Sequence, residues 1–172
     1  MTKRPVSAPR GQSDAPATFE MDAIPVRSLR VEDTDAVARI DAPASGRSRP
    51  DYFRKRIEAS KRDGGVSLSC AAEVDGLLVG FLIASVDYGE FGVMEPVAVI
   101  DTVGVHPEYR GRHVGKALMR QLGLNLQGLR IEKVRTEVDW RRADLLAYFQ
   151  ASGFVPVPRL VLETNVTDIP RE

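Results

Sequence analysis

The spacing of apolar residues in the first third of the chain predicts one strand followed by two helices. Ile24–Leu29 alternates apolar and polar side chains, which is typical of a strand. In Glu32–Asp41 the apolar residues recur at helical spacing, and acidic residues occupy the first turn, where the helix dipole favours them. Pro50 suits the opening turn of a second helix, in which Phe53 and Ile57 share one face.

From Val66 the apolar residues recur at every second position, so strands are expected next. Val66–Val74 alternates, Asp75-Gly76 is a hairpin-turn pair, and Leu77–Val86 is expected to return beside the preceding strand. Val97–Val105 is apolar at nearly every position, which is typical of a central strand covered on both faces.

The last third of the chain alternates helices and strands. The expected elements are a helix over Gly115–Gln127 with Gly128 as its C-cap, a strand over Lys133–Trp140, a helix over Arg142–Ser152 ended by Gly153, and a final strand over Phe154–Leu162. The whole order predicts a mixed sheet with helices packed on it.

Composition narrows the class of protein. The 172 residues suit one domain, and residues 1–21 are expected to form a flexible tail. Lys+Arg and Asp+Glu both total 24, so the chain lacks the overall positive charge of nucleic-acid-binding proteins. The single cysteine, Cys70, excludes an intrachain disulfide, and Leu77–Val86, the most apolar run, is far shorter than the ~20 residues of a membrane-spanning helix. We therefore expect a soluble, cytoplasmic protein without a membrane or nucleic-acid partner.

The segment with the clearest chemistry is Val103-Gly-Val-His-Pro-Glu-Tyr-Arg-Gly-Arg-His-Val-Gly-Lys-Ala117, a buried strand that turns into an amphipathic helix. Gly111 and Gly115 let a ligand approach the backbone closely. The first amides of the helix have no intrahelical acceptor, and Arg110, Arg112 and Lys116 add positive charge. Together these features predict a phosphate or pyrophosphate site, as an alternative to a capped helix with solvated arginines.

Two common phosphate motifs do not fit this segment. A Walker A loop needs four residues between its glycines and a Ser or Thr after its lysine, whereas three residues separate Gly111 from Gly115 and Ala117 follows Lys116. A dinucleotide fingerprint follows the first strand of a parallel unit, but this segment lies past the middle of the chain.

The stretch Val105–Leu118 resembles the acyl-CoA-binding motif of the GNAT superfamily of N-acyltransferases, whose core reads Q/R-x-x-G-x-G/A. Ala147-Tyr-Phe-Gln-Ala-Ser-Gly-Phe154 is similar to the superfamily's late helix ending in "GF". The order of elements from Ile24 to Leu162 also matches. The resemblance therefore covers nearly all of the chain except the tail.

The resemblance implies a single α/β (α+β) acyltransferase domain over residues 22–172, with a mixed, mostly antiparallel sheet of about six or seven strands and about four helices. It implies acetyl-CoA or another acyl-CoA as co-substrate, no metal, and an amine acceptor; it also allows a homodimer. The backbone near Val103 and Val105 would bind the pantetheine arm, and amides of Arg110 through Gly115 would bind the pyrophosphate. The implied acyl-CoA-binding residues are Val103, Gly104, Val105, Arg110, Gly111, Arg112, His113, Val114, Gly115, Lys116 and Ala117.

The sequence departs from the superfamily pattern at two positions. His113 stands where the motif usually has its second glycine, which strains the loop only if the turn requires a positive φ. Many members have a tyrosine that protonates the leaving thiolate at the position of Phe149, and here Tyr148 lies one residue earlier. Because one residue rotates a helical side chain by about 100°, Tyr148 is either the general acid or a packing residue, with solvent as the alternative proton source.

Asp101 is the candidate general base. It is the lone carboxylate in the apolar strand Val97–Val105, at a position where relatives often carry a glutamate, and burial there would raise its pKa. The structural alternative is a carboxylate satisfied by neighbouring amides or hydroxyl groups. An N–H near Val103 is the expected oxyanion donor.

The acceptor site is less well specified. Arg47, Glu90 and Glu137 are weak candidates for contacting the acceptor, and Arg47 begins a basic run that extends to Arg62. Two other readings stay open: a non-catalytic acyl-CoA-binding sensor, which the Phe149 substitution favours, and a nucleic-acid-binding domain that uses the basic helix. Cys70 is expected to be a small core residue rather than a nucleophile.

Overall fold

The structure is a computed structural model that describes residues 24–60, 68–88 and 95–170. The chain divides into two compact units, Met1–Thr136 and Glu137–Glu172. The expected tail over residues 1–21, Glu90 and the start of the strand at Val66 lie outside the described residues.

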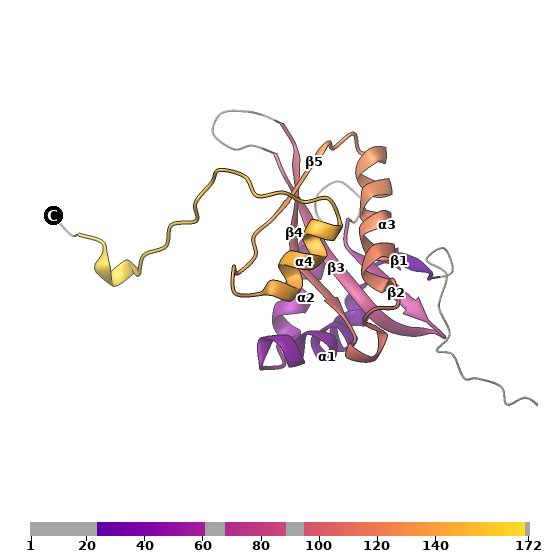
Figure 1. The fold of residues 1–172 in the computed structure, drawn as a ribbon. Helices are drawn as coiled ribbons and strands as arrows, with labels where there is room; N and C mark the ends of the chain where they lie inside the picture. Colours follow the sequence, from indigo (N-terminus) through magenta and orange to yellow (C-terminus); the bar gives the residue numbers. More distant parts are fainter. Residues whose placement is uncertain (1–23, 61–67, 89–94, 171–172) are drawn as a thin grey trace, which may run out of the picture. The chain divides into compact units, whose positions relative to one another are not determined.

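A five-stranded sheet forms the centre of the first unit, in the spatial order β1-β2-β3-β4-β5 (Figure 1). The strands are β1 Val26–Ser28, β2 Cys70–Val74, β3 Leu77–Asp87, β4 Val97–Val105 and β5 Lys133–Thr136. Neighbouring strands pair antiparallel except β4 and β5, which are parallel. The predicted mixed, mostly antiparallel sheet is confirmed, with fewer strands in the described part of the chain than expected.

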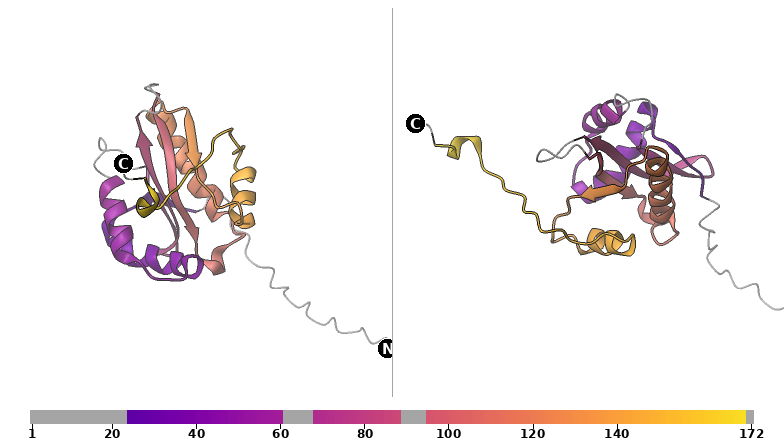
Figure 2. Two further views of the ribbon diagram at one scale, coloured as in Figure 1. Left: turned by 90° about the vertical axis from the view of Figure 1, so that its left-hand side faces the viewer. Right: turned by 90° about the horizontal axis from the view of Figure 1, so that it is seen from above.

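Helices cover both faces of this sheet (Figure 2). The first unit contains a 3-10 helix Val31–Asp33 and the α-helices α1 Thr34–Ser45, α2 Pro50–Ser60 and α3 Val114–Gly128. A Cβ added at Gly104 of β4 would meet Phe81 and Ile40, whereas one added at Gly80 of β3 would meet Val114 and Leu118 of α3. Helices α1 and α2 therefore pack on one face, and α3 packs on the other.

The face under α1 and α2 holds an apolar core. Phe53 of α2 and Phe81 of β3 meet edge to face, with ring centroids 5.7 Å apart, and both side chains are fully buried. Leu29, Val37, Ile40, Ile57, Ala71 and Ile83 belong to the same cluster. The apolar stripes that predicted the two helices are the faces buried here.

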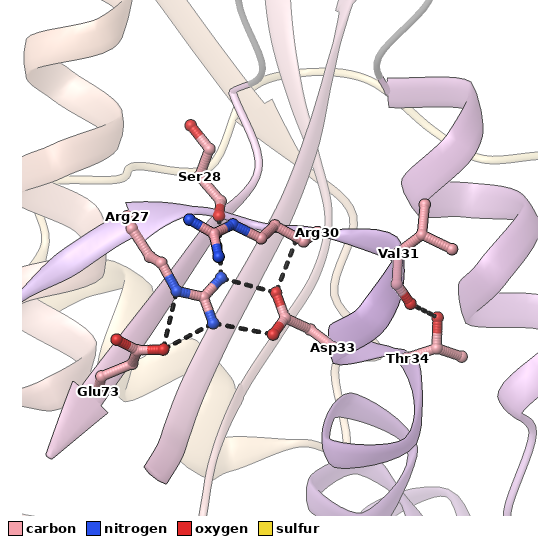
Figure 3. Close-up of polar contacts among 7 residues, drawn as sticks. All are labelled: Arg27, Ser28, Arg30, Val31, Asp33, Thr34 and Glu73. Atoms are coloured by element: carbon pink, nitrogen blue, oxygen red, sulfur yellow. Dashed lines mark hydrogen bonds and ion pairs between the residues drawn. The ribbon is translucent and has the colours of Figure 1, made fainter. Parts of the chain in front are cut away.

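A charged cluster fixes the start of α1 against the edge of the sheet (Figure 3). The Arg27 guanidinium of β1 donates to both carboxylate oxygens of Asp33, at 2.7 and 2.8 Å, and to Glu73 of β2 at 2.8 Å. The Arg30 amide also donates to Asp33, at 2.7 Å. Burial alone would raise the pKa of Asp33, but the hydrogen bonds from Arg27 and Arg30 outweigh it, so the pKa of Asp33 is lowered.

Local turn chemistry behaves as predicted at the first hairpin. Asp75 and Gly76 join β2 to β3 with φ values of 52° and 77°. Two successive positive φ angles match the right-handed twist of the flanking strands, and glycine adopts such angles without a steric penalty.

The end of α3 differs from the prediction. Gly128 is the last helical residue rather than the cap, and the left-handed residue is Arg130, with φ of 56°. The Ile131 amide donates to the Leu126 carbonyl oxygen at 3.0 Å, and both side chains are buried. Burial of Ile131 therefore sets where the chain turns, in place of the glycine preference.

The strand predicted over Lys133–Trp140 ends at Thr136. Asp139 begins a turn instead, because its side chain accepts from the Arg141 amide at 3.0 Å and its carbonyl oxygen accepts from the Arg142 amide at 2.8 Å. This competition between an aspartate side chain and a strand ladder is common at turns.

The second unit contains one α-helix, α4 Ala143–Ala151, and a short 3-10 helix Val166–Asp168. Gly153, with φ of 88°, follows α4, and the Phe154 ring packs edge to face on Phe149 with centroids 5.1 Å apart. The predicted final strand over Phe154–Leu162 is wrong: this segment is irregular and mostly exposed. Pro156 and Pro158 lack the amide hydrogens that a strand ladder requires.

Among the residues that the structure describes, none of the helices combines the length and the apolar character needed to cross a bilayer.

Candidate active site

The predicted phosphate-binding loop connects β4 to α3 through two left-handed residues. After the 3-10 helix Pro107–Tyr109, Gly111 has φ of 75° and His113 has φ of 64°, and α3 begins at Val114. The Ala117 amide donates to the His113 carbonyl oxygen at 3.0 Å, which closes the first turn of α3. The loop therefore places the N-terminus of α3, with its positive partial charge, shortly after the end of β4.

Three cationic side chains, those of Arg110, Arg112 and Lys116, belong to this loop and to the first turn of α3. The Arg110 Nε donates to the Val105 carbonyl oxygen at 3.4 Å, and the Arg112 guanidinium lies 5.5 Å from the centroid of the Tyr109 ring. Both arginines and Lys116 are exposed. Exposed cations beside a helix N-terminus favour a dianionic or polyanionic ligand.

His113 adopts the conformation that the glycine of the motif would supply. Its positive φ decides between the two outcomes expected from the sequence: the loop requires a left-handed residue, and a Cβ is accommodated there at some cost. Histidine tolerates this region better than branched residues do. The loop of this chain thus has a left-handed residue at position 113 although that residue is not glycine.

The ladder between β4 and β5 stops halfway along β4. Its last pair is Ile100 with Thr136, and the Thr136 hydroxyl donates to the Ile100 carbonyl oxygen at 3.0 Å. Because β4 continues to Val105 while β5 ends, Val103–Val105 pair with β3 on one edge and have no β5 partner on the other. An extended chain with amide groups fits such an edge as an added strand.

Asp101 occupies a β-bulge in β4. In the pairing with β3, Ile83 faces Thr102 and Ala84 faces Ile100, so Asp101 is the extra residue. Bulges bend a strand and redirect a side chain, and they occur frequently beside active sites. The bulge also lies where the β4–β5 ladder ends, which places Asp101 next to the unpaired edge.

The Asp101 carboxylate contacts the Arg56 guanidinium of α2 and the Ser85 hydroxyl of β3. Desolvation by burial raises the pKa of Asp101 above its ordinary value, and the charge of Arg56 and the hydrogen bonds from Ser85 and Arg56 offset only part of that rise. A carboxylate with a raised pKa is a better proton acceptor than an ordinary one.

Arg56 is the residue of this site that the sequence analysis did not single out. The signal was present, because Phe53, Arg56, Ile57 and Ser60 follow the i, i+3, i+4, i+7 spacing of the sheet-facing stripe. Within that stripe Phe53 and Ile57 are fully buried. A charged side chain on the sheet-facing side of a helix needs a partner. Only the fold shows that the partner of Arg56 is Asp101.

The other predicted site residues belong to other elements. Arg47 lies in the loop between α1 and α2, where its carbonyl oxygen accepts from the Ser45 hydroxyl at 2.9 Å. Glu137 follows β5 and is exposed. Tyr148 lies on α4 against the ring of Phe149, and burial raises the pKa of Tyr148 to about 12.

Cys70 of β2 is buried, and burial raises the pKa of its thiol to about 12. Its Sγ donates to the Leu68 carbonyl oxygen at 3.2 Å. A buried, protonated thiol is a weak nucleophile, in agreement with the expected core role. Within the described ranges, no group of three His, Cys, Asp or Glu side chains is arranged to hold a metal ion.

Comparison with known families agrees with this geometry. A sequence model of the acetyltransferase (GNAT) family matches residues 34–154, which include the bulge, the loop and α4. The chain belongs to the GNAT family. Curated protein sequences, in contrast, give no significant match to this GNAT chain.

Solved structures share the GNAT fold. The aminoglycoside N-acetyltransferase AAC(6')-Iy, solved in complex with CoA, has a TM-score of 0.71 at 17% identity, over 83% of this chain and 95% of its own. The ribosomal-protein-alanine N-acetyltransferase from Brucella melitensis biovar Abortus 2308 has a TM-score of 0.64 at 23% identity, over 83% and 100% of the two chains. Glucosamine-6-phosphate N-acetyltransferase from Arabidopsis thaliana has a TM-score of 0.64 at 15% identity, over 82% and 97%.

Proposed function

We propose that this chain moves an acetyl group from acetyl-CoA to a primary amine by direct transfer. The observation that carries the proposal is the continuity of one segment: a strand edge at Val103–Val105 that β5 does not cover leads through a positive loop into the N-terminus of α3. A strand edge suits the amide-containing pantetheine arm, and a helix N-terminus suits a pyrophosphate. The family match and the CoA complex of AAC(6')-Iy support the same ligand.

In this proposal the backbone of Val103, Gly104 and Val105 pairs with the pantetheine arm. The pyrophosphate is bound by the segment Arg110, Gly111, Arg112, His113, Val114, Gly115, Lys116 and Ala117. Its amides supply the hydrogen bonds, and Arg110, Arg112 and Lys116 supply charge. No metal is required, because the developing charge on the carbonyl oxygen is stabilised by an N–H near Val103.

Asp101 acts as the general base. It accepts a proton from the acceptor's ammonium group, directly or through water, and the neutral amine then attacks the thioester carbonyl carbon. A C–N bond forms, the tetrahedral intermediate collapses, and the C–S bond breaks to release the CoA thiolate. The second proton on nitrogen balances the proton that the thiolate receives.

The proton for the thiolate comes from Tyr148 or from water. A tyrosine whose pKa is raised to about 12 stays protonated at neutral pH but releases its proton less readily than a free phenol. We therefore expect Tyr148→Phe to keep much of the activity. Arg47 and Glu137 remain proposed contacts of the acceptor, and Glu90 lies outside the described residues.

A non-catalytic acyl-CoA sensor is the second candidate. The observation that favours it is Phe149, which replaces the tyrosine of many relatives and is buried. A sensor would bind CoA with the same loop but would release no thiol when an amine is added.

Two measurements test the proposal on the full chain. The first is the melting temperature with acetyl-CoA, longer acyl-CoAs, ATP and NAD; saturating CoA species should stabilise the fold by about 2.7 kcal/mol at a hundredfold excess over Kd. The second is thiol release from acetyl-CoA with a panel of primary amines. Stabilisation without thiol release would favour the sensor, and no effect of any CoA species would refute both candidates.

A further inference from the structure

In the Arg56–Asp101 ion pair, the arginine is the more exposed partner and has an unused hydrogen-bond donor. The Arg56 side chain is 41% exposed, whereas the Asp101 side chain is 17% exposed. The buried Nε of Arg56 has no hydrogen-bond partner among the described residues, although a guanidinium carries five donors. The arginine therefore keeps donor capacity and an exposed charge directly beside the carboxylate that we assign as the base.

An acceptor that carries only an amine meets an obstacle at this pair. Its ammonium group must compete with Arg56 for Asp101, and success would leave the guanidinium without an anion. Removing one partner of a partly buried ion pair is unfavourable, because the remaining charge stays desolvated. An acceptor that also brings a carboxylate avoids this loss, because it supplies a new partner to each member of the pair.

We propose that the acceptor is an amine with a carboxylate close to its amino group, as in an amino acid. Its ammonium group pairs with Asp101 and its carboxylate pairs with Arg56. This inference rests on the proposed function, in which Asp101 takes the proton from the acceptor. A guanidinium suits the second role because its planar donors match a carboxylate in a bidentate arrangement.

The reaction keeps the acceptor's carboxylate unchanged. The ammonium group gives one proton to Asp101, which passes it to water. Nitrogen then forms the bond to the acetyl carbon, the C–S bond breaks, and the second nitrogen proton balances the one taken up by the thiolate. The products are the N-acetyl amino acid, CoA as its thiol and one released proton.

Several cationic residues lie on or beside α2, and they differ in their contacts. Arg54 and Lys55 neighbour Arg56 in sequence but are exposed, whereas Arg56 faces the sheet. Arg49, which directly precedes α2, donates to the Asp41 carboxylate at 2.8 Å and lies over the Tyr52 ring, so its charge is already matched. Of these cations, Arg56 is the one in contact with Asp101.

Matched pairs of acceptors provide the test. Thiol release from acetyl-CoA is measured with glycine against glycinamide and with leucine against leucinamide. The amides have the more easily deprotonated amines, so they are the better acceptors when the carboxylate is not recognised. We expect kcat/KM to be about tenfold or more higher for the acids. Equal use of both members, or a preference for the amides, would overturn the inference while leaving the proposed function intact.

The variants Arg56→Gln and Arg54→Gln separate recognition from structure. Both remove one positive charge from α2, but only Arg56 contacts Asp101. We expect Arg56→Gln to lose the preference because the KM for the acids rises more than the KM for the amides, and Arg54→Gln to keep the preference. An equal loss on acids and amides would show a structural role and overturn the inference.

The wild-type comparison decides the question even if Arg56→Gln does not fold. Calorimetry of acetyl-CoA binding shows whether it is the proposed function, rather than this inference alone, that fails. If no amine in the panel releases thiol, the proposed function fails and this inference fails with it.

Discussion

At the scale of single residues, the site depends on a carboxylate whose neighbours have opposing effects on its pKa. Burial raises the pKa of Asp101, and Arg56 and Ser85 lower it by a smaller amount. The result is a carboxylate that binds a proton more readily than an exposed aspartate does. This balance makes Asp101 the residue whose change is most informative.

Asp101→Asn should lower kcat by about 10²–10⁴-fold, because an amide cannot accept the proton from the ammonium group. Acetyl-CoA affinity should be unchanged by calorimetry. In the wild type, kcat/KM should fall as the pH drops through the raised pKa of Asp101, since the base works only when deprotonated, and this acidic limb should vanish in the variant. Glu58→Gln, an exposed change on α2, is the control; a fully active Asp101→Asn would exclude the assigned role.

His113 is the other informative residue, because its φ of 64° is unfavourable for a side chain with a Cβ. His113→Gly should raise the free energy of unfolding by up to about 1 kcal/mol, and acetyl-CoA affinity should not fall, because amides supply the contacts. Denaturant unfolding of His113→Gly beside His113→Ala measures the effect, since alanine keeps the Cβ. A loss of stability in the glycine variant would mean that the imidazole makes a stabilising contact.

At the scale of elements, the close approach of the β3 backbone to α3 sets the position of that helix. A Cβ at Gly80 of β3 would lie 2.6 Å from the Val114 Cγ1 and 3.2 Å from the Leu118 Cδ1. Both contacts are with the first two turns of α3, the part that begins at the phosphate-binding loop. The missing side chain on β3 thus sets the distance between the sheet and that helix.

Gly80→Ala should therefore destabilise the protein by about 1–3 kcal/mol and weaken acetyl-CoA binding, because α3 must shift to accept the methyl group. Gly123→Ala lies on the same helix with nothing within 4 Å of the added Cβ, so it should stabilise the protein by up to about 1 kcal/mol. Denaturant unfolding and calorimetry of the two variants provide the comparison. Equal effects would show that packing against Gly80 does not position α3.

At the scale of the whole molecule, resistance to acid depends on carboxylates that ion pairs hold ionised. Asp33 is such a group, since Arg27 and the Arg30 amide lower its pKa below the unfolded value. Its contribution to folding is complete above the unfolded pKa of about 3.9 and is lost as the pH falls through the lower folded value.

Asp33→Asn should reduce the free energy of unfolding at neutral pH by about 1–3 kcal/mol, because Arg27 loses a charged acceptor. The difference from the wild type should shrink as the pH falls below about 4, where the wild-type carboxylate also becomes protonated. Denaturant unfolding at a series of pH values measures it. Asp35→Asn, an exposed carboxylate of α1, should show a smaller change; a constant difference at all pH values would contradict the ionic explanation.

Features that depend on neighbouring residues could be predicted before the fold was known. The Asp75-Gly76 hairpin, the start of α2 at Pro50, the amphipathic α3 and the loop before it follow from turn chemistry, periodicity and capping, which act over a few residues. The candidate base Asp101 was also visible, because one carboxylate in an apolar strand is conspicuous in any fold.

Features that depend on residues far apart in the chain required the three-dimensional fold. The Arg56–Asp101 pair joins α2 to β4, the bulge at Asp101 exists only in the pairing with β3, and the end of the β4–β5 ladder follows from a turn at Asp139. The cap of α3 escaped prediction for the same reason, because the burial of Ile131 depends on partners that a single stretch of sequence does not contain. The irregular segment after Phe154 is different, because Pro156 and Pro158, which lack ladder donors, are visible in the sequence itself.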